Sequence, residues 1–277
     1  GRIMVELPGI KEPERVRKLL QGSANLEFWE TYNSNEIVPT LQAVDSKLRE
    51  VLAVAGGEEA APAEAKAESA VSATDSLAAA LKGETANNEA LMEQMKKEHP
   101  LASILQLGGY GSVVGIANYK DTAEVNKLLA VKEAQNLLPR DLRLKWGVKS
   151  MDKAGQLFEL FAIKVTERNG KAPLEGDVIT DAKNDFDQYN NPTVSMSMNT
   201  DGSRRWATLT KNNIGRAIAI VLDGYVYSAP NVQNEITGGN SQISGSFTPE
   251  ETLDLANVLK SGKMPAPARI VQEDIVG

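Results

Sequence analysis

The stretch Ala217-Ile218-Ala219-Ile220-Val221-Leu222-Asp223-Gly224-Tyr225-Val226-Tyr227 carries the clearest structural signal in this sequence of 277 residues. Its first six residues are all apolar, a run that is typical of a buried strand. Asp223-Gly224 separates this run from a second strand-like run, and an Asp-Gly pair at such a place is a strong signal for a two-residue hairpin turn. The sequence therefore predicts an antiparallel hairpin, which ends at Pro230.

The residues on both sides of this hairpin predict further strands and two helices. Val194, Met196 and Met198 alternate with polar residues, as in a strand with one buried face. One helix is predicted over 203–213. Thr248-Pro249-Glu250-Glu251 has the cap, the first-turn proline and the capping-box glutamate of a second helix. This helix is expected to bury Leu253, Leu255, Val258 and Leu259, and further strands are expected over 242–247 and 268–271.

The N-terminal half shows the same mixture of patterns. Strands over 3–7 and 26–29 on either side of a short helix that begins at Glu12 predict a β-α-β unit. The remaining expected elements are helices over 38–55, 91–99 and 121–131, the last one capped by Asp121, and strands over 113–117, 142–146 and 157–165. Together these elements predict an α+β fold with antiparallel or mixed sheets and helices packed on one face.

Composition excludes several classes of protein and of site. The net charge of −7 argues against a broad nucleic-acid-binding face. Cysteine is absent, so disulfides, thiolate metal sites and cysteine nucleophiles are excluded, and the single histidine, His99, excludes a multi-histidine zinc site. The longest apolar run is Ala217–Leu222, whereas a membrane-spanning helix needs about 20 residues. Because the chain opens on Gly1-Arg2 and enters a strand at once, we expect it to be an excised part of a longer protein.

Three patterns that could carry chemistry have simpler interpretations. Gly108–Gly111 lacks the lysine and the Ser/Thr of a phosphate-binding loop, so a plain turn is expected. Asp181, Asp185 and Asp187 lack the glycine and the late glutamate of a calcium loop, so solvated loop aspartates are expected. His99 lies in a polar stretch and is expected at the surface. The sequence therefore predicts no catalytic residue, no cofactor site and no metal site.

Two features bear on binding and on order. Trp206 and Phe247 are large apolar side chains, for which a place in the core is the first expectation and contact with a binding partner the second. Residues 57–80 are rich in alanine and acidic residues and contain no aromatic residue, so a mobile loop or a frayed helix is expected there. The residues alone thus describe an α+β module for binding.

Several separated segments occur in an order and spacing that resembles one known family. They are Arg2–Gly9, Leu26–Phe28, Leu174–Ala182, Asn213–Gly224, Ile243–Thr248, Leu259–Pro267, Ile270–Glu273 and Val276-Gly277. Together they resemble the large periplasmic domain of the SecD family, over residues 1–32 and 172–277. Residues 33 to about 155 depart from the commoner pattern of that family and resemble a lineage-specific insertion.

The resemblance implies a function without catalysis. SecD, alone or fused with SecF, sits in the bacterial inner membrane beside the SecYEG channel and uses the proton gradient to assist late export. This chain would be the part on the periplasmic side that captures the emerging, unfolded preprotein. The proton-carrying residues of the family lie in membrane helices that this chain does not contain. No enzyme activity, no cofactor and no nucleic-acid partner are implied.

The resemblance also implies a division of the chain. Residues 1–32 and 263–277 match a ferredoxin-like base, which is expected to be truncated at its N-terminus, and residues 172–262 match the core of a head subdomain. Residues 33–171 would be the insertion and connecting region. A hinge between head and base is expected at the two crossings, and its candidate residues are Glu30, Asn33, Gly262, Pro265 and Pro267.

Two other hypotheses remain open at this point. The chain could be a purely structural or interaction spacer on the translocon, without direct contact with preprotein. An enzyme could also be hidden in the insertion, in which case replacement of His99 would abolish a hydrolytic activity. Trp206 and Phe247 are the candidate preprotein contacts under the first, favoured hypothesis.

Overall fold

The computed structural model describes residues 25–56, 80–245 and 247–261. The elements predicted over 3–7, from Glu12 and over 268–271, and residues 57–79 of the alanine-rich stretch, lie outside the described residues. The chain divides into two compact units. The first, here called the sheet unit, comprises Gly1–Ile37, Gly108–Tyr119 and Arg140–Gly277. The second, here called the helical unit, comprises Val38–Leu107 and Lys120–Pro139. None of the helices in the described part is long and apolar enough to cross a membrane.

The helical unit is built from most of α2 and from four shorter elements. The elements are α2 (Ser34–Ala55), α3 (Ala80–Glu98), β2 (Leu105–Leu107), α4 (Thr122–Leu129) and α5 (Lys132–Leu137). Leu41, Val44 and Leu48 of α2 are fully buried at the spacing of one helix face, while Leu52 is 45% exposed, so the fully buried stripe ends at Leu48. Asp121 stands at the N-cap of α4, so the predicted position of the cap is confirmed, but its side chain makes no capping hydrogen bond.

The carboxylate of Asp45 joins two parts of the helical unit. Its Oδ1 accepts the backbone N–H groups of Leu101 and Ala102 at 2.9 and 3.0 Å, and its Oδ2 lies 3.0 Å from Nδ1 of His99. Asp45 is buried, whereas the His99 side chain is 53% exposed. His99 therefore lies at the surface, as predicted, and one of its ring nitrogens faces a buried carboxylate.

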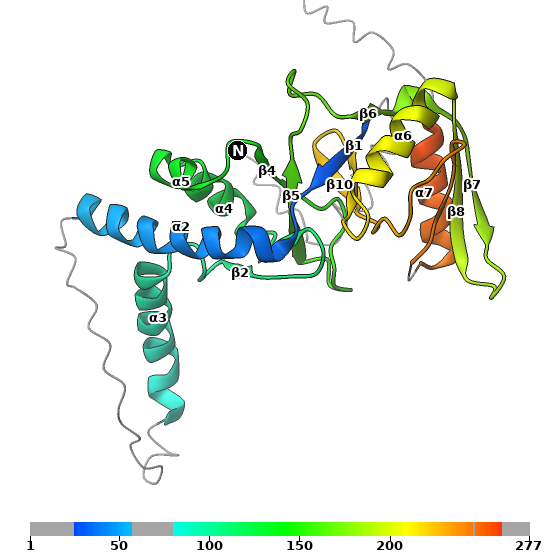
Figure 1. Cartoon of the computed structure of the whole chain (residues 1–277). Helices are drawn as coiled ribbons and strands as arrows, with labels where there is room; N and C mark the ends of the chain where they lie inside the picture. Colours follow the sequence, from blue (N-terminus) through cyan, green and yellow to red (C-terminus); the bar gives the residue numbers. More distant parts are fainter. Residues whose placement is uncertain (1–24, 57–79, 246, 262–277) are drawn as a thin grey trace, which may run out of the picture. The chain divides into compact units, whose positions relative to one another are not determined.

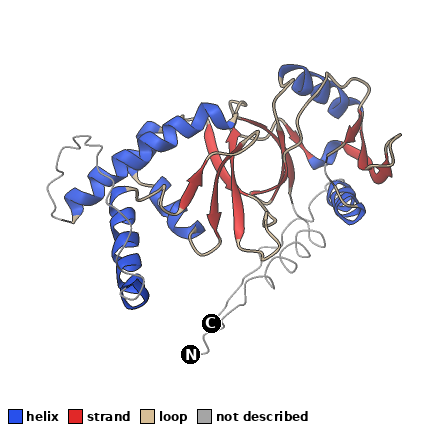
Figure 2. Ribbon diagram, turned by 90° about the horizontal axis from the view of Figure 1, so that it is seen from below, coloured by secondary structure: helices blue, strands red, loops and turns tan. Residues whose placement is uncertain are grey.

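A large curled sheet forms the frame of the sheet unit (Figure 2). Its strands are β1 (Leu26–Thr31), β3 (Val113–Asn118), β4 (Leu142–Trp146), β5 (Leu157–Lys164), β6 (Leu174–Glu175), β9 (Ile218–Leu222) and β10 (Tyr225–Ser228). They run in the order β10-β9-β1-β5-β3, with β4 also paired to β5 and β6 to β1, and all these pairs are antiparallel. The N–H of Val148, just after β4, donates to the carbonyl of Val226 in β10 at 2.8 Å, so the sheet curls back on itself.

The hairpin predicted at Asp223-Gly224 is confirmed. All five residues of β9 are buried, as the unbroken apolar run requires. Asp223 and Gly224 have φ values of 46° and 87°, the two positive angles of a type I′ turn. The carboxylate of Asp223 also accepts the N–H of Asn25 at 2.8 Å, which fixes the start of β1 beside the turn.

A second, three-stranded sheet lies in the same unit, with helix α7 packed against it (Figure 1). It contains β7 (Ile179–Phe186), β8 (Pro192–Met198) and β11 (Asn240–Ile243), in the order β11-β8-β7, and both pairs are antiparallel. Helix α7 (Pro249–Ser261) begins at the predicted cap, where the N–H of Glu251 donates to the hydroxyl of Thr248 at 3.2 Å. The short 3-10 helix Gly176–Val178 leads into β7.

The two sheets share one apolar core, to which α6 (Thr200–Asn212) and α7 also contribute. Leu26 and Phe28 of β1, three residues of β9, and the buried faces of β7, β8, α6 and α7 all belong to it. The opposite face of the curled sheet forms a separate cluster. That cluster contains Trp29, Val113, Phe161, Ile163, Ala172, Ala219, Val221 and Val226. Every strand named above for this sheet, except β4, therefore contributes to one of these two apolar clusters.

The predicted α+β class with antiparallel sheets is confirmed, and several local predictions are wrong. The strand predicted over 242–247 lies at Asn240–Ile243, and Phe247 falls after it, because the bend at Ser244-Gly245 ends the strand. Asp181 and Asp185 lie in β7 and only Asp187 lies in a turn. Leu253 is 47% exposed, since it lies on the outer face of α7.

Candidate functional site

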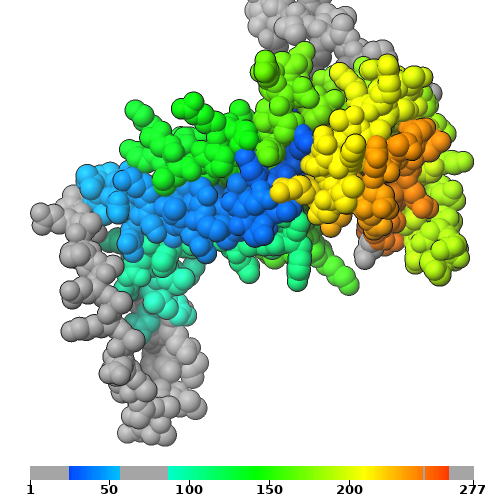
Figure 3. Space-filling model, in the orientation of Figure 1, coloured from blue at the N-terminus to red at the C-terminus, as the bar shows by residue number. Residues whose placement is uncertain are grey.

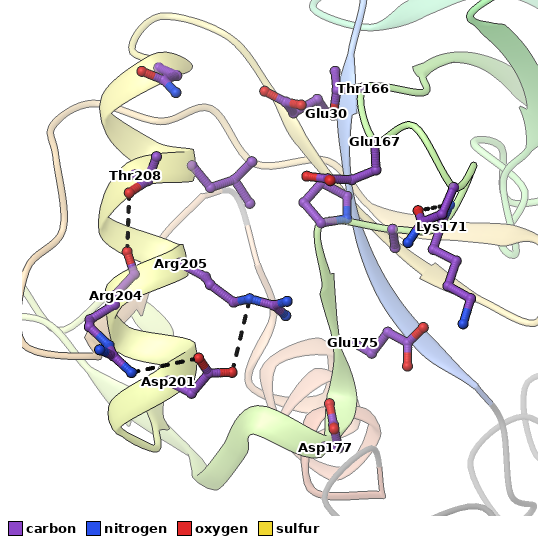
Figure 4. A pocket seen from close by; sticks show the side chains of 15 residues that line it. Glu30, Thr166, Glu167, Lys171, Glu175, Asp177, Asp201, Arg204, Arg205 and Thr208 are labelled. Carbon is purple, nitrogen blue, oxygen red and sulfur yellow. Dashed lines mark hydrogen bonds and ion pairs between the residues drawn. The ribbon is translucent and has the colours of Figure 1, made fainter.

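A charged cleft with a volume of about 970 Å³ lies in the sheet unit, between β1 and β6 on one side and α6 on the other (Figure 4). The chain from Thr166 to Asp177 supplies most of the first wall. The residues that line the cleft are Glu30, Thr166, Glu167, Asn169, Lys171, Ala172, Pro173, Glu175, Asp177, Asp201, Arg204, Arg205, Thr208, Leu209 and Asn212. Five of them are acidic and three are basic, so the cleft is polar and carries both signs of charge.

One face of helix α6 supplies the second wall of this cleft. Asp201 lies at the start of that face, and Arg204 and Arg205 each lie 3.9 Å from one of its carboxylate oxygens. Both arginine side chains are more than half exposed, so these ion pairs contribute little to stability. Figure 4 shows the guanidinium group of Arg205 extending from α6 toward the side of the cleft that carries Glu175. The two arginines are thus free to bind another charged group without loss of the fold.

Glu30, one of the predicted hinge residues, lies on the floor of the cleft. Its carboxylate accepts a 2.8 Å hydrogen bond from the side-chain amide of Asn213, the residue at the end of α6. The same amide also donates to the carbonyl of Leu209. A single side chain therefore links β1 of the curled sheet to the C-terminal turn of α6.

The chain around Asn33, the second predicted hinge residue, is held by several interactions. The hydroxyl of Tyr32 donates to the carboxylate of Asp141, and burial together with this bond raises the pKa of Tyr32 above its ordinary value. The N–H of Ser34 donates to the carbonyl of Gly111 at 2.7 Å. Gly262, Pro265 and Pro267, the remaining hinge candidates, lie outside the described residues.

A second hollow lies beside strand β11 and is here called the β11 groove. Its volume is about 490 Å³, and it is lined by Trp206, Thr210, Ile218, Pro230, Asn231, Val232, Gln233, Asn234, Ile236, Asn240, Ser241, Gln242, Ile243 and Ser244. Apolar side chains from α6, β9 and β11 alternate there with amides and hydroxyls. In Figure 3 the surface of α6 is yellow and the surface of α7 is orange.

Of the two sequence candidates, Trp206 lines this groove, whereas Phe247 is not among the residues that line it. The side chain of Trp206 is only 7% exposed. Its ring packs edge-on against the ring of Phe28, with 5.4 Å between the ring centroids. It is therefore part of the core and of the groove floor at once. Phe247 is half-buried and packs against the same core from the bend that follows β11.

The groove walls are residues that sequence reasoning did not single out. Ile236, Asn240 and Gln242 belong to a loop and to a short polar strand, and polar alternation there gives no sign of a hollow. The one sequence feature that marks the turn between the two walls of the groove is Gly238-Gly239. Their φ values of 83° and 74° reverse the chain direction there.

The described part of the chain contains no group of three or more His, Asp or Glu side chains that could hold a metal ion. The cleft and the groove supply instead charged groups, amides and apolar surface in hollows that remain open to solvent. Such surfaces bind polypeptides or small molecules by shape, hydrogen bonds and charge.

Two family models match parts of the sheet unit, one near each end of the chain. A family model described as the SecDF P1 head subdomain matches residues 161–266, and a model described as the N-terminal part of the P1 domain of protein translocase subunit SecDF matches residues 1–33. The first match contains the cleft wall, α6, the groove and α7. The second contains β1, including Glu30.

Relatives extend the similarity over the whole chain. The protein translocase subunit SecD of Rhodothermus marinus is 40% identical over 279 aligned residues, which cover 100% of this chain and 42% of that protein. The SecD of Magnetococcus marinus is also 40% identical, over 50% of this chain and 26% of that protein. The chain thus spans less than half of the length of the relatives it matches.

A solved structure of SecDF from Thermus thermophilus, a translocon-associated membrane protein, aligns with 93% of this chain and 34% of its own, at 19% identity and a TM-score of 0.34. The full-length sequence match to Rhodothermus marinus SecD also includes residues 34–160, which neither family model covers. The chain therefore belongs to the SecD family and corresponds to its P1 domain.

Proposed function

We propose that this domain, on the periplasmic side of the bacterial inner membrane, captures emerging preprotein for the Sec translocon. The observation that carries the proposal is the β11 groove, which joins apolar side chains such as Ile236 and Ile243 to the amides of Asn234 and Gln242. Unfolded chains of many sequences share only apolar side chains and backbone amides, and this groove offers partners for both. In this proposal the domain performs no catalysis, and its partners in the whole protein are SecF and the SecYEG channel.

Photo-crosslinking during export tests this capture directly. A photoreactive amino acid is placed at Gln242 or at Asn234, both exposed in the groove, in the full-length protein that contains this domain. The matched control position is Asn184, an exposed residue of β7 on the opposite edge of the small sheet. Crosslinks to a stalled exported chain are expected from the two groove positions and not from Asn184. Equal labelling of all three positions, or none, would favour the structural spacer.

The second part of the proposal is movement of the head against the base, driven by the proton gradient in the membrane part. The charged cleft supports it, because Glu30 of the predicted base lines the cleft together with α6 of the predicted head, and weak ion pairs engage Arg204 and Arg205 of α6. A change in the width of the cleft would then carry bound preprotein relative to β1. Glu30 and Asn33 are the described residues through which the chain would bend.

A reversible lock tests the movement. The chain has no native cysteine, so one cysteine in the predicted base, at Glu30, and one in the predicted head, at Asn213, whose side chains lie 2.8 Å apart, can form a single new disulfide. Oxidation is expected to block late export and reduction to restore it, while each single cysteine variant exports normally in both conditions. Normal export by the fully oxidised double variant would contradict the proposed movement, and the proposed capture of preprotein would be unaffected.

A further inference from the structure

In the part of the chain that the structure describes, strand β11 pairs along one edge, with β8, and its other edge is open. The N–H of Met198 donates to the carbonyl of Gly239 at 2.9 Å, and Asn240–Ile243 pair in register with Ser197–Val194. In an antiparallel ladder, hydrogen-bonded pairs alternate with pairs whose backbone groups point away from the partner strand. Ser241 therefore directs its backbone groups to β8, whereas Asn240 and Gln242 direct theirs to the open edge.

The open edge faces the β11 groove and not bulk solvent alone. Asn240 and Gln242 line this groove together with residues 230–236. Among the described residues, no backbone hydrogen bond joins Asn240 or Gln242 to the opposite wall. Their outward N–H and C=O groups thus stand along a hollow that is lined by apolar side chains.

The opposite wall is held by backbone hydrogen bonds to other elements at Val232 and Ile236. The N–H of Val232 donates to the carbonyl of Arg216 at 2.9 Å, and the carbonyl of Val232 accepts the N–H of Gly215 at 2.8 Å. Further along, the N–H of Ile236 donates to the hydroxyl of Thr210 at 2.9 Å. These bonds hold the wall against α6 and β9, so the space between the wall and β11 stays open.

We propose that an extended polypeptide segment enters this space as a fourth strand of the small sheet, paired through its backbone to Asn240 and Gln242. This inference rests on the proposed capture of preprotein and specifies how the groove would bind it. Alternate side chains of the segment point into the hollow over Trp206 and Ile236, and the others point to solvent. Recognition through the backbone requires an extended segment with free N–H groups and places little demand on its sequence.

A second copy of this chain is a poorer occupant. Its own β11 edge is flanked by its own residues 230–236, and that wall would have to enter the same space. The edge also offers outward groups from only two residues of a four-residue strand, which is short for a pairing between two folded sheets. A single unfolded segment meets neither obstacle.

The first test removes one outward donor from β11. Gln242→Pro deletes an N–H that β8 does not use, and proline is tolerated on edge strands in this situation. The matched control is Asn184→Pro, because residue 184 holds the equivalent outward place on the open edge of β7. A blocked, fluorescent heptapeptide of alternating valine and threonine is titrated into the whole domain by anisotropy. Affinity is expected to fall about tenfold for Gln242→Pro and to stay unchanged for Asn184→Pro.

The second test changes the peptide and so does not depend on whether the proline variant folds. N-methylation of alternate residues blocks one edge of an extended peptide, and two complementary sets block the two edges. One set is expected to abolish binding to the wild-type domain and the other to leave it unchanged. Equal binding of both peptide sets would overturn the inference of strand pairing. If Gln242 nevertheless crosslinks to preprotein, the groove would capture preprotein through side-chain contacts instead. Dimerisation of the domain that Gln242→Pro abolishes would also overturn it, in favour of a second copy.

Discussion

The indole N–H of Trp206 donates a 2.6 Å hydrogen bond to the hydroxyl of Ser241, across 35 positions of sequence. Both groups are buried, and the bond joins the middle of α6 to strand β11. Since Trp206 also meets the ring of Phe28 in β1, one side chain connects both sheets and the helix between them. Trp206 therefore sets the position of the groove floor relative to β11.

Trp206→Phe is expected to destabilise the sheet unit by about 1–3 kcal/mol, because it leaves the hydroxyl of Ser241 without its buried partner. The phenyl ring keeps most of the packing, so the loss should be no larger. Trp206→Ala should cost about 3–5 kcal/mol through the cavity it leaves. Urea unfolding followed by far-UV circular dichroism measures both. Trp206→Phe combined with Ser241→Ala should recover part of the loss, and a double variant less stable than the sum of the single ones would contradict this account.

Gly202 in α6 is expected to tolerate no larger residue, because a Cβ there would lie 2.5 Å from the Cβ of Val178. Gly202→Ala should therefore destabilise the domain by about 1–3 kcal/mol, although alanine is the better helix former. Val178→Gly removes the Cβ that the added methyl group would meet, so the double variant should be more stable than the two separate losses predict. Thermal unfolding of the four proteins completes the cycle, and strict additivity would show that the two sites do not touch.

Local chemistry made much of the fold predictable. The Asp223-Gly224 turn, the apolar run of β9 and the cap at Thr248 each depend on a few neighbouring residues, and each is found where the sequence indicates. The failures occur where neighbours distant in sequence decide. Asn240 belongs to β11 because strand β8 pairs with it, at Ser197. The residue pattern of a short, four-residue strand cannot reveal a partner that lies so far away in the sequence.

The candidate site was less predictable than the fold. The cleft combines α6 with residues 166–177 and with Glu30, and the groove combines α6 with two segments that precede α7. Such hollows form between elements, so no single segment carries their signal. Trp206 was identifiable because a large aromatic residue on a predicted helix is notable in isolation, whereas Gln242 was not.

Asp45→Ala is expected to loosen residues 99–105 of the helical unit. The substitution leaves the N–H groups of Leu101 and Ala102 without their carboxylate acceptor, and a buried unpaired group costs about 1–3 kcal/mol. Hydrogen exchange measured by mass spectrometry should become faster over 99–105, with no change over β9. Asp45→Asn keeps an acceptor oxygen at that place and should have a smaller effect. Protection that is unchanged in Asp45→Ala would show that other contacts hold this turn.

Glu27→Gln is expected to stabilise the domain at neutral pH and to have no effect in acid. Burial raises the pKa of Glu27 above its ordinary value of 4.5, and the carboxylate of Glu175, directly opposite in the β1–β6 pair, raises it further. With a folded-state pKa above the unfolded one, the contribution of Glu27 to stability is fully present below pH 4.5 and is lost as the pH rises through the folded value. The amide removes this pH-dependent loss.

Melting temperatures of wild type and Glu27→Gln between pH 4 and 8 measure the effect, and the gain should appear as the pH rises above about 4.5. Glu93→Gln, on the exposed surface of α3, is the matched control and should show no such gain. Glu175→Gln should produce a gain of its own, and adding it to Glu27→Gln should give less than the sum, because either change removes the same repulsion. A gain that is equal at pH 4 and pH 8 would mean that the amide improves packing or hydrogen bonding and that the charge of Glu27 is not what burial penalises.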